Sequence, residues 1–276
     1  MMRPTPVYKD VVLIGGGHTH VEVLRRFGTS PRPGVRLTLI TDTLSAPYSG
    51  MIPGFVSGHY SLKECHIDLS RLVKFANARV IISSAVGIDS KDRRVELDSF
   101  RGLKRPSVKY DLLSINVGIT PATSGIAGVE EFTTPVKPIS SFARKVDVIL
   151  DGFVADYCLG SHCEVGEAAP PYRVAVVGGG AGGVELACAM QYRLRALEEE
   201  RCGHSTGAAR RFQVVLVSKG PILGSSSSSV RSNILKLLSE RDVRVIQSNV
   251  GVTRVEKGVL HIGSEREPFE DCLWCT

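Results

Sequence analysis

The chain has 276 residues, of which 43% are hydrophobic and 22% are charged. This composition excludes disordered and collagen-like chains, and the length predicts two globular domains. The net charge is +6, and in the densest basic stretch, Lys91 to Lys109, aromatic residues do not interleave with the charges in a nucleic-acid-binding pattern, so a solvated hairpin is favoured over a nucleic-acid surface.

The hydropathy of the sequence predicts neither a membrane span nor a secretory signal. No stretch approaches the roughly 18 uninterrupted apolar residues that a membrane span needs. The first ten residues, MMRPTPVYKD, lack the apolar segment of a secretory signal. We therefore expect a cytoplasmic protein without a transmembrane segment, and leave contact with a membrane surface open.

The first predicted unit is a strand, a glycine turn, a helix and a second strand. Val11–Ile14 is an apolar run that stops at three glycines, and apolar residues at helical spacing follow as far as Phe27. Val35–Ile40 is the next predicted strand, so the order indicates a parallel βαβ unit. A short helix and three strands are predicted after it: Asp68–Ala76, Arg79–Ile88, Arg93–Leu97 and Val108–Ile115.

The second predicted unit repeats this order. A strand at Arg173–Val177 leads through glycines into a helix over Val184–Arg201. Ser229 is expected to cap a helix that runs through Leu238. Two further strands and a hairpin are predicted: Phe212–Ser218, Val243–Gln247 and Val252–Ile262.

Each glycine turn has the spacing of a dinucleotide-binding loop. Gly178, Gly180 and Gly183 complete the pattern G-x-G-x-x-G, in which bare backbone approaches a pyrophosphate at the start of a helix. In the first turn Gly15 and Gly17 are placed correctly, but His20 stands where the third glycine is usual. Because that third glycine serves helix–strand packing, its loss is compatible with binding and predicts a wider separation of helix and sheet.

Other residues near the turns leave alternatives open. His18 and His20 are either polar contacts beside a cofactor or local packing and capping groups. Thr41 and Asp42, at the end of the second strand, are the candidate acceptors for ribose hydroxyls, and Asp42 is the better acceptor. The corresponding strand of the second unit ends in Ser218 and Lys219, so NADH and NADPH are not distinguished.

Seven cysteines are scattered along the chain, and we expect them to be structural or incidental. Two pairs have close spacing, Cys158 with Cys163 and Cys272 with Cys275, but nothing in the sequence brings the pairs together as a metal site. A disulfide reductase would need a cysteine pair close to a flavin. The stretch from Thr41 to Tyr60 contains none, which argues against that function.

The two turns, with YDLLSINVGITP between them, resemble the flavoproteins that have two dinucleotide-binding domains. GGGHTHVEVLRRFG, APYSGMIPGFVSGHYS and HIDLSRLVKFANARV resemble more narrowly the module fused to some selenide, water dikinases, itself similar to type II NADH dehydrogenases. The resemblance covers nearly the whole chain, and the histidine in place of glycine is usual in that module. Nothing in the chain resembles the catalytic part of the dikinase.

The predicted fold class is α/β, with two Rossmann-like FAD- and NAD(P)-binding domains, each a mainly parallel sheet with helices and a β-meander. Residues 1–140 are expected to form the first part of the FAD domain, 141–171 a linker or insertion with a candidate helix, and 172–276 the NAD(P) domain. Relatives continue beyond residue 276 into a segment that closes the FAD domain, so the chain is expected to lack that segment.

The resemblance implies FAD and NAD(P)H as cofactors, with hydride passing from nicotinamide to flavin and then to a small-molecule, quinone-like acceptor. No catalytic acid or base and no metal are required. The implied partners include neither nucleic acid nor a membrane span, and a homodimer is compatible. The alternative function is a non-catalytic dinucleotide-binding or regulatory module. Eleven residues are implied in cofactor binding: Gly15, Gly16, Gly17, His18, Asp42, Pro47 and Gly118 for FAD, and Gly178, Gly180, Gly183 and Glu185 for NAD(P)H.

Overall fold

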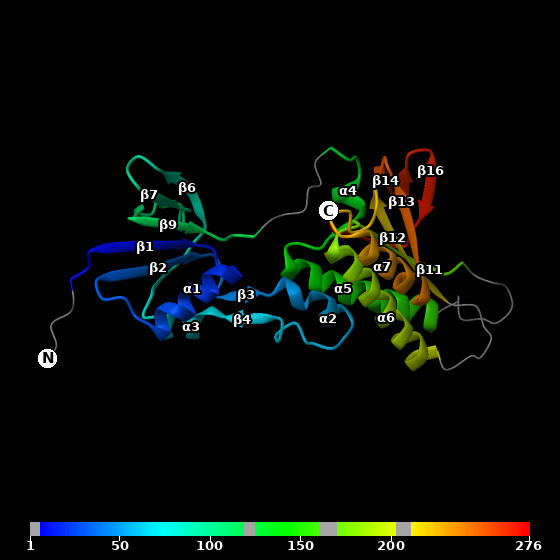
Figure 1. Ribbon diagram of the computed structural model, residues 1–276, viewed down its shortest axis with the longest axis horizontal. Helices are drawn as coiled ribbons and strands as arrows, with labels where there is room; N and C mark the ends of the chain where they lie inside the picture. The colour runs from blue at the N-terminus through cyan, green and yellow to red at the C-terminus, as the bar shows by residue number, and fades with distance from the viewer. Residues whose placement is uncertain (1–5, 119–124, 160–169, 203–210) are drawn as a thin grey trace. The chain divides into compact units, whose positions relative to one another are not determined.

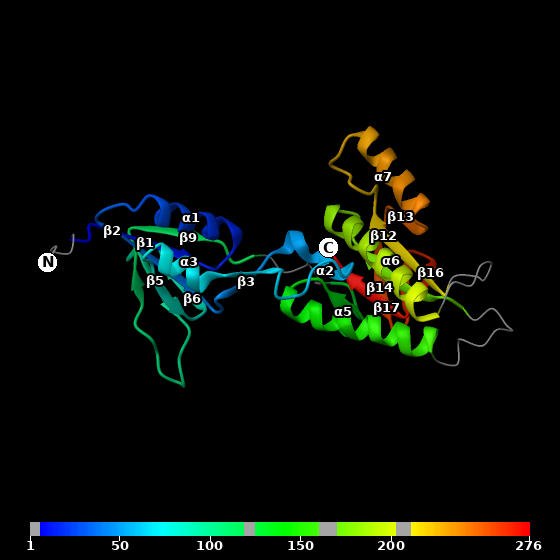
Figure 2. The same cartoon turned by 90° about the horizontal axis from the view of Figure 1, so that it is seen from below.

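The computed structural model describes residues 6–118, 125–159, 170–202 and 211–276 (Figure 1). The chain divides into two compact units, the first made of Met1–Tyr48 with His66–Ile119 and the second of Ser49–Cys65 with Thr120–Thr276. Both are α/β units built on a parallel sheet, as predicted, and Figure 2 shows their elements from a second direction. None of the described helices is both long and apolar enough to cross a membrane.

The first unit is built on a four-stranded parallel sheet. Its strand order is β5-β2-β1-β9, in which β1 (Lys9–Ile14) lies between β2 (Val35–Thr41) and β9 (Leu112–Ile115) and β5 (Arg79–Ile82) is at the edge. The short strands β3 (Ser45–Pro47) and β4 (His66–Asp68) form a separate antiparallel pair.

Alternation along these strands places two different layers on the two faces of the sheet. Leu13 and Leu39 point to the face covered by α1 (His18–Thr29) and α3 (Leu69–Phe75). Their neighbours Val12 and Ile40 point to the opposite face, where an antiparallel three-stranded meander packs. The meander strands are β6 (Ala85–Asp89), β7 (Arg94–Leu97) and β8 (Val108–Lys109).

The second unit repeats this plan around a five-stranded parallel sheet of order β10-β17-β11-β12-β13. Its strands are β10 (Thr134–Pro135), β11 (Tyr172–Val177), β12 (Phe212–Lys219), β13 (Val243–Ser248) and β17 (Asp271–Trp274). The helices are α2 (Ile52–Val56), α4 (Val129–Phe132), α5 (Ile139–Phe153), α6 (Ala181–Cys202) and α7 (Ser228–Glu240), with a 3-10 turn at Ser49–Met51 and a π-helical turn at Val154–Cys158. The meander strands are β14 (Val252–Glu256), β15 (Val259–Ile262) and β16 (Glu265–Pro268).

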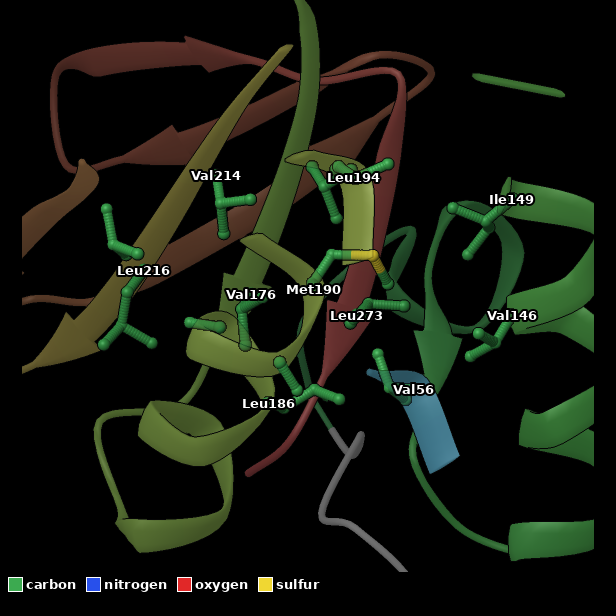
Figure 3. Packing of buried hydrophobic residues seen from close by; sticks show 14 of the residues in the cluster. Val56, Val146, Ile149, Val176, Leu186, Met190, Leu194, Val214, Leu216 and Leu273 are labelled. Carbon is green, nitrogen blue, oxygen red and sulfur yellow. The ribbon is translucent and has the colours of Figure 1, made fainter. Parts of the chain in front are cut away.

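The core of the second unit lies between its sheet and its helices. Met190 and Leu194 of α6 are fully buried against sheet residues such as Val176, Leu216 and Leu273 (Figure 3). The alternate strand residues, among them Ala175 and Trp274, face the meander on the other side of the sheet. This two-sided burial explains why the central strands read as continuous apolar runs.

Two segments belong to a different unit from the one expected. Ile52 and Val56 of α2 are buried in the core of the second unit, although they stand within the predicted first domain. Phe142 and Phe153 of α5 are fully buried in the same core, so most of the predicted linker 141–171 is part of the second unit. The expected boundaries at residues 140 and 171 are therefore displaced, because apolar faces of these helices are buried beside α6 and the sheet.

Two predicted strands and one helix cap also differ. Arg79–Ile88 and Val108–Ile115 are each divided between the parallel sheet and the meander. The second division falls between Tyr110, whose N–H donates to the Arg93 carbonyl at 3.0 Å, and Asp111, whose N–H donates to the Asp10 carbonyl at 2.8 Å. Ser227 caps α7 in place of the predicted Ser229, its hydroxyl oxygen accepting from the Val230 N–H at 3.4 Å.

Candidate functional site

Two glycine turns leave the middle of the two parallel sheets at equivalent positions. The Gly15 N–H donates to the Ile40 carbonyl at 2.8 Å, and the Gly178 N–H donates to the Val217 carbonyl at 2.8 Å. Both glycines have left-handed φ angles, +89° and +136°. Each turn therefore lies at the carboxyl edge of its sheet, where the neighbouring strands run to either side and ligands of open α/β sheets bind.

The first glycine of each turn is required by the adjacent strand of its sheet. A Cβ on Gly15 would lie 2.3 Å from the carbonyl oxygen of Asn116, the residue after β9. A Cβ on Gly178 would lie 3.0 Å from the Cβ of Cys275, the residue after β17. With the left-handed φ angles, these contacts leave room for glycine alone unless the backbone moves.

Each turn leads directly into a helix whose first N–H groups are free. The backbone N–H groups of Gly16, in the turn, and of His18 and Thr19, at the start of α1, have no partner among the described residues, and the N-cap Gly17 has no side chain to cap them. At the start of α6 the N–H groups of Gly180 and Ala181 are likewise without a described partner. Free donors and the positive end of the helix dipole together favour an anion at both places.

Gly180 and Gly183 have different reasons to be glycine. A Cβ on Gly183 would lie 1.9 Å from the Gly178 carbonyl oxygen, so this glycine allows α6 to approach the turn. A Cβ on Gly180 would meet nothing within 4 Å, and the residue is exposed with no left-handed φ. The described chain itself does not require glycine at position 180. A ligand that approaches the backbone from outside would require it.

His20 replaces the third glycine of the first turn with a pair of hydrogen bonds. The ring is fully buried, with Nδ1 2.7 Å from the Gly15 carbonyl oxygen and Nε2 2.9 Å from the Ser114 hydroxyl. Burial lowers the pKa of His20, which favours the neutral ring in this environment. Of the two interpretations left open by the sequence, the structure supports local packing for His20, whose ring links α1 to the turn and to β9.

His18 has a different environment from His20. It is exposed, and its ring centroid lies 4.4 Å from that of Tyr48 in a tilted arrangement. The ring therefore lies outside the core, at the first turn of α1.

Asn116 is a residue of the first turn that the sequence did not single out. Its Oδ1 is buried without a hydrogen-bond partner in the described part of the chain. The same atom lies 1.9 Å from the position of a Cβ on Gly17, so the carboxamide rests directly on the bare backbone of the turn. A buried acceptor without a donor is costly, and a ligand hydroxyl or N–H at the turn would satisfy it. The only sequence signal was a polar residue directly after the apolar strand β9.

The second strand of each unit brings one further side chain to its turn. Thr41 is buried, and its hydroxyl oxygen would lie 3.5 Å from a Cβ on Gly16. Asp42, the predicted ribose acceptor, follows it and is exposed at the same edge. In the second unit the buried Ser218 contacts Gly179 in the same way, and the exposed Lys219 takes the position of the acid.

A profile of the pyridine nucleotide-disulphide oxidoreductase family matches residues 9–276. The chain belongs to this family. It is 25% identical over 272 residues to the NADH dehydrogenase-like protein YutJ of Bacillus subtilis, covering 96% of this chain and 64% of the relative. It is 27% identical over 222 residues to the NADH dehydrogenase-like protein Rv1812c of Mycobacterium tuberculosis, covering 78% and 49%. The chain thus spans less than two thirds of the length of these relatives.

Solved structures share the fold of the chain at lower sequence identity. NDH2 of Plasmodium falciparum in complex with NADH superposes with a TM-score of 0.80 at 18% identity, over 97% of this chain and 55% of that one. The sulfide:quinone oxidoreductase of Aquifex aeolicus gives 0.74 at 20% identity, over 97% and 58%. These likenesses confirm the predicted fold class of two Rossmann-type units.

The remaining implied residues of this family member lie on different elements. Pro47 ends β3 and is half-buried, and Gly118 follows β9 with a φ of +82° and open space around its Cβ position. Glu185 is exposed near the start of α6. Each of the three stays a prediction as a cofactor contact.

The family takes part of its name from disulphide chemistry, but the cysteines whose side chains the structure describes are thiols that are either buried or partly buried. Cys272 packs into the meander side of the second sheet, whereas Cys275 packs on the helix side. Burial raises the pKa of both thiols, that of Cys275 to about 12. Cys65 is buried as well, and Cys163 lies outside the described residues. The burial of these thiols fits the expected structural or incidental role. No group of three or more metal-ligating side chains occurs in the described ranges.

Proposed function

We propose that the chain is an FAD-dependent NAD(P)H oxidoreductase, with FAD on the first turn and NAD(P)H on the second. Membership of the family and the names of the NADH dehydrogenase-like relatives support this proposal. The observation that carries it is the open, exposed backbone at Gly180 beside free N–H groups, because nothing in the described chain accounts for a glycine there.

The residues of the first turn fit a dinucleotide. Gly15, Gly16 and Gly17 would face its pyrophosphate, with the free N–H groups of α1 as donors. The unpaired Asn116 Oδ1 would accept from the bound nucleotide, and the exposed Asp42 would accept from ribose hydroxyls.

The second turn fits in the same way, with one difference of charge. Gly178 and Gly180 would face the pyrophosphate of the nicotinamide nucleotide, and Gly183 would keep α6 close to the turn. Lys219 stands where the first unit has an acid, and its charge would tolerate a 2′-phosphate. Flavin and nicotinamide, when bound, supply the hydride chemistry, so the chain's own task is to bind and orient them.

The acceptor proposed for the electrons is a small molecule of the quinone type. A homodimer and contact with a membrane surface are compatible with this proposal, as is a cytoplasmic location. The alternative is a dinucleotide-binding module without turnover. One observation favours the alternative: the Asn116 carboxamide occupies the space directly over Gly17, where the first turn would receive a phosphate.

The test is a spectrum of the purified protein, followed by substitution of the open glycine. After incubation with FAD the protein should absorb near about 450 nm, and anaerobic NADH or NADPH should bleach it. Gly180→Val should weaken binding of the nicotinamide nucleotide at least about tenfold, because the side chain fills the pyrophosphate approach. The unfolding midpoint of this variant should equal that of the wild type, since the added Cβ meets no other residue.

Gly152→Val is the matched control. Gly152 lies in α5, and its Cβ position is also free of neighbours within 4 Å. This variant should bind nucleotide like the wild type. Unchanged affinity in Gly180→Val would contradict the assignment of the second turn. A colourless protein that binds NAD(P)H but cannot take up FAD would establish the alternative module.

A further inference from the structure

A cavity of about 450 Å³ lies in the first unit, between its parallel sheet and the β6–β8 meander. Apolar side chains, including Ile81, Leu97 and Val108, form part of its wall. The volume is within the range of small-molecule pockets, about 300–1,000 Å³. The charged residues that line it are one acid and five bases: Asp10, Arg36, Arg79, Arg94, Arg105 and Lys109.

The strand pattern accounts for this convergence of positive charge. Arg36 and Arg79 lie near the amino ends of β2 and β5, at alternate positions with the buried Ile40 and Ile81 of the meander face. In the meander, Arg94 of β7 is directly paired in register with Lys109 of β8, and both residues line the cavity. Like charges at directly opposed positions of an antiparallel pair are destabilising, so an anion bound beside Arg94 and Lys109 would relieve this repulsion.

The single acid does not neutralise these bases. Asp10 is engaged by Arg36 through two hydrogen bonds of 2.5 and 2.9 Å. Arg94 donates to the Ser107 hydroxyl and Arg105 to the Ile82 carbonyl, each at 3.0 Å, and both acceptors are neutral. Within the described ranges, Arg79, Arg94, Arg105 and Lys109 form no ion pair, so the lining keeps four uncompensated positive charges.

The cavity is separate from the nucleotide turn of the same unit. Asp10 and Arg36 lie near the amino ends of β1 and β2, whereas Gly15 follows the carboxyl end of β1. At about 3.3 Å per residue, the five residues from Asp10 to Gly15 place the turn roughly 16 Å from Asp10 along the strand. Arg79 pairs with Thr38, which pairs with Val12, so Arg79 lies roughly 10 Å before the level of the turn.

We propose that this cavity binds a small phosphorylated molecule, independently of the two dinucleotides. Arginine forks suit phosphate oxygens in pairs, and the four free cations match a multiply charged anion. The apolar wall would contact the organic part of the ligand, which a purely surface cluster of bases could not do. The site would then be a second binding site of the first unit, with Asp10 and Arg36 near the amino ends of their strands and the nucleotide turn at the carboxyl ends.

Tripolyphosphate is the probe that tests the charge recognition. It is titrated calorimetrically at low ionic strength into protein saturated with FAD and NADH, which keeps both nucleotide turns occupied. The double variant Arg79→Gln with Lys109→Gln should weaken binding at least about tenfold, because it removes two of the four free cations. Lys74→Gln with Lys91→Gln is the matched control: both lysines are exposed in the same unit and lie outside the lining.

Gly180→Val separates this proposal from the proposed function. That variant should bind tripolyphosphate like the wild type, even where it no longer binds nicotinamide nucleotide. If the two double variants weakened tripolyphosphate binding equally, general surface charge would explain the binding, and the proposed site would be wrong. Displacement of tripolyphosphate by FAD or NADH, or no measurable binding to the folded wild type, would overturn it as well.

Discussion

The two glycine turns of this chain are built on one plan and differ in how the helix is attached. In both, a central strand ends in a left-handed glycine, the neighbouring strand contacts that glycine, and a helix with free N–H groups follows. In the second turn the helix is held close by Gly183, which contacts the Gly178 carbonyl directly. In the first turn the ring of His20 lies beside the equivalent carbonyl of Gly15.

This difference shows what the third glycine contributes. One turn satisfies the geometry by leaving out a side chain, and the other by inserting a buried ring that bonds at both nitrogens. The glycines that we propose to face a phosphate are kept in both turns. The third position is therefore a packing position, and any residue that fills the space and satisfies its partners can hold it.

Removing His20 should have the largest effect on stability. His20→Ala leaves a cavity, and the Gly15 carbonyl and the Ser114 hydroxyl both lose a partner, so the first unit should be destabilised by about 3 kcal/mol. Hydrogen exchange measured by mass spectrometry should show loss of protection in β1 and β9. His18→Ala, at the exposed neighbouring histidine, should change stability by less than about 0.5 kcal/mol.

The single tryptophan tests whether this effect is confined to the first unit. Trp274 is buried in the second unit, so its fluorescence reports on that unit. Its unfolding transition should be the same in His20→Ala and in the wild type. If the free energy of unfolding measured from tryptophan fluorescence fell by as much as the free energy of exchange in β1, the two units would unfold together. The attribution of the effect to the first turn would then be wrong.

Adding one carbon at the third glycine of the second turn should have an intermediate effect. A Cβ on Gly183 meets the Gly178 carbonyl oxygen at 1.9 Å, so Gly183→Ala must shift α6 or β11. Overpacking of this kind costs roughly 1–3 kcal/mol, and we expect about 2 kcal/mol from the Trp274 transition in denaturant.

Gly182→Ala is the control for that substitution. It adds the same carbon one residue earlier, where nothing lies within 4 Å, and should be neutral or stabilising by up to about 1 kcal/mol because alanine favours the helix. If both alanines had the same effect, helix propensity and not the contact with Gly178 would explain it.

The sequence predicted those features of the two turns that depend on neighbouring residues in the chain. The glycine turns, the strands before them and the helices after them come from apolar runs and turn residues that need no knowledge of partners. The pattern could not predict that α2 joins the core of the second unit, or that Val108–Ile115 changes sheets at Tyr110. Both depend on which apolar surface a segment meets, and apolar spacing does not state this.

The same limit explains the residues of the site that were missed. Asn116 and Ser114 reach the first turn because β9 pairs with β1, a contact between residues about one hundred positions apart. Likewise, the sequence shows that His20 stands in the third position, but its ring has a role only because Ser114 lies on the neighbouring strand.

Substitution of Asn116 should have the smallest effect on stability, and it is the change that best distinguishes the first turn from the second. Its carboxamide rests on Gly17, whereas the equivalent Gly180 is open, so the first turn is either completed by this side chain or blocked by it. Asn116→Ala removes the penalty of a buried acceptor that has no partner in the described chain, but it also removes the packing of the side chain over Gly17. These two effects oppose each other, so the stability of the protein without cofactor should change by less than about 0.5 kcal/mol. If Oδ1 accepts from FAD, the variant should bind FAD several-fold more weakly, by about 1 kcal/mol, in a fluorescence titration. Tighter binding of FAD by the variant would instead show that the side chain blocks the turn, which is the outcome expected of a module that uses only its second nucleotide site.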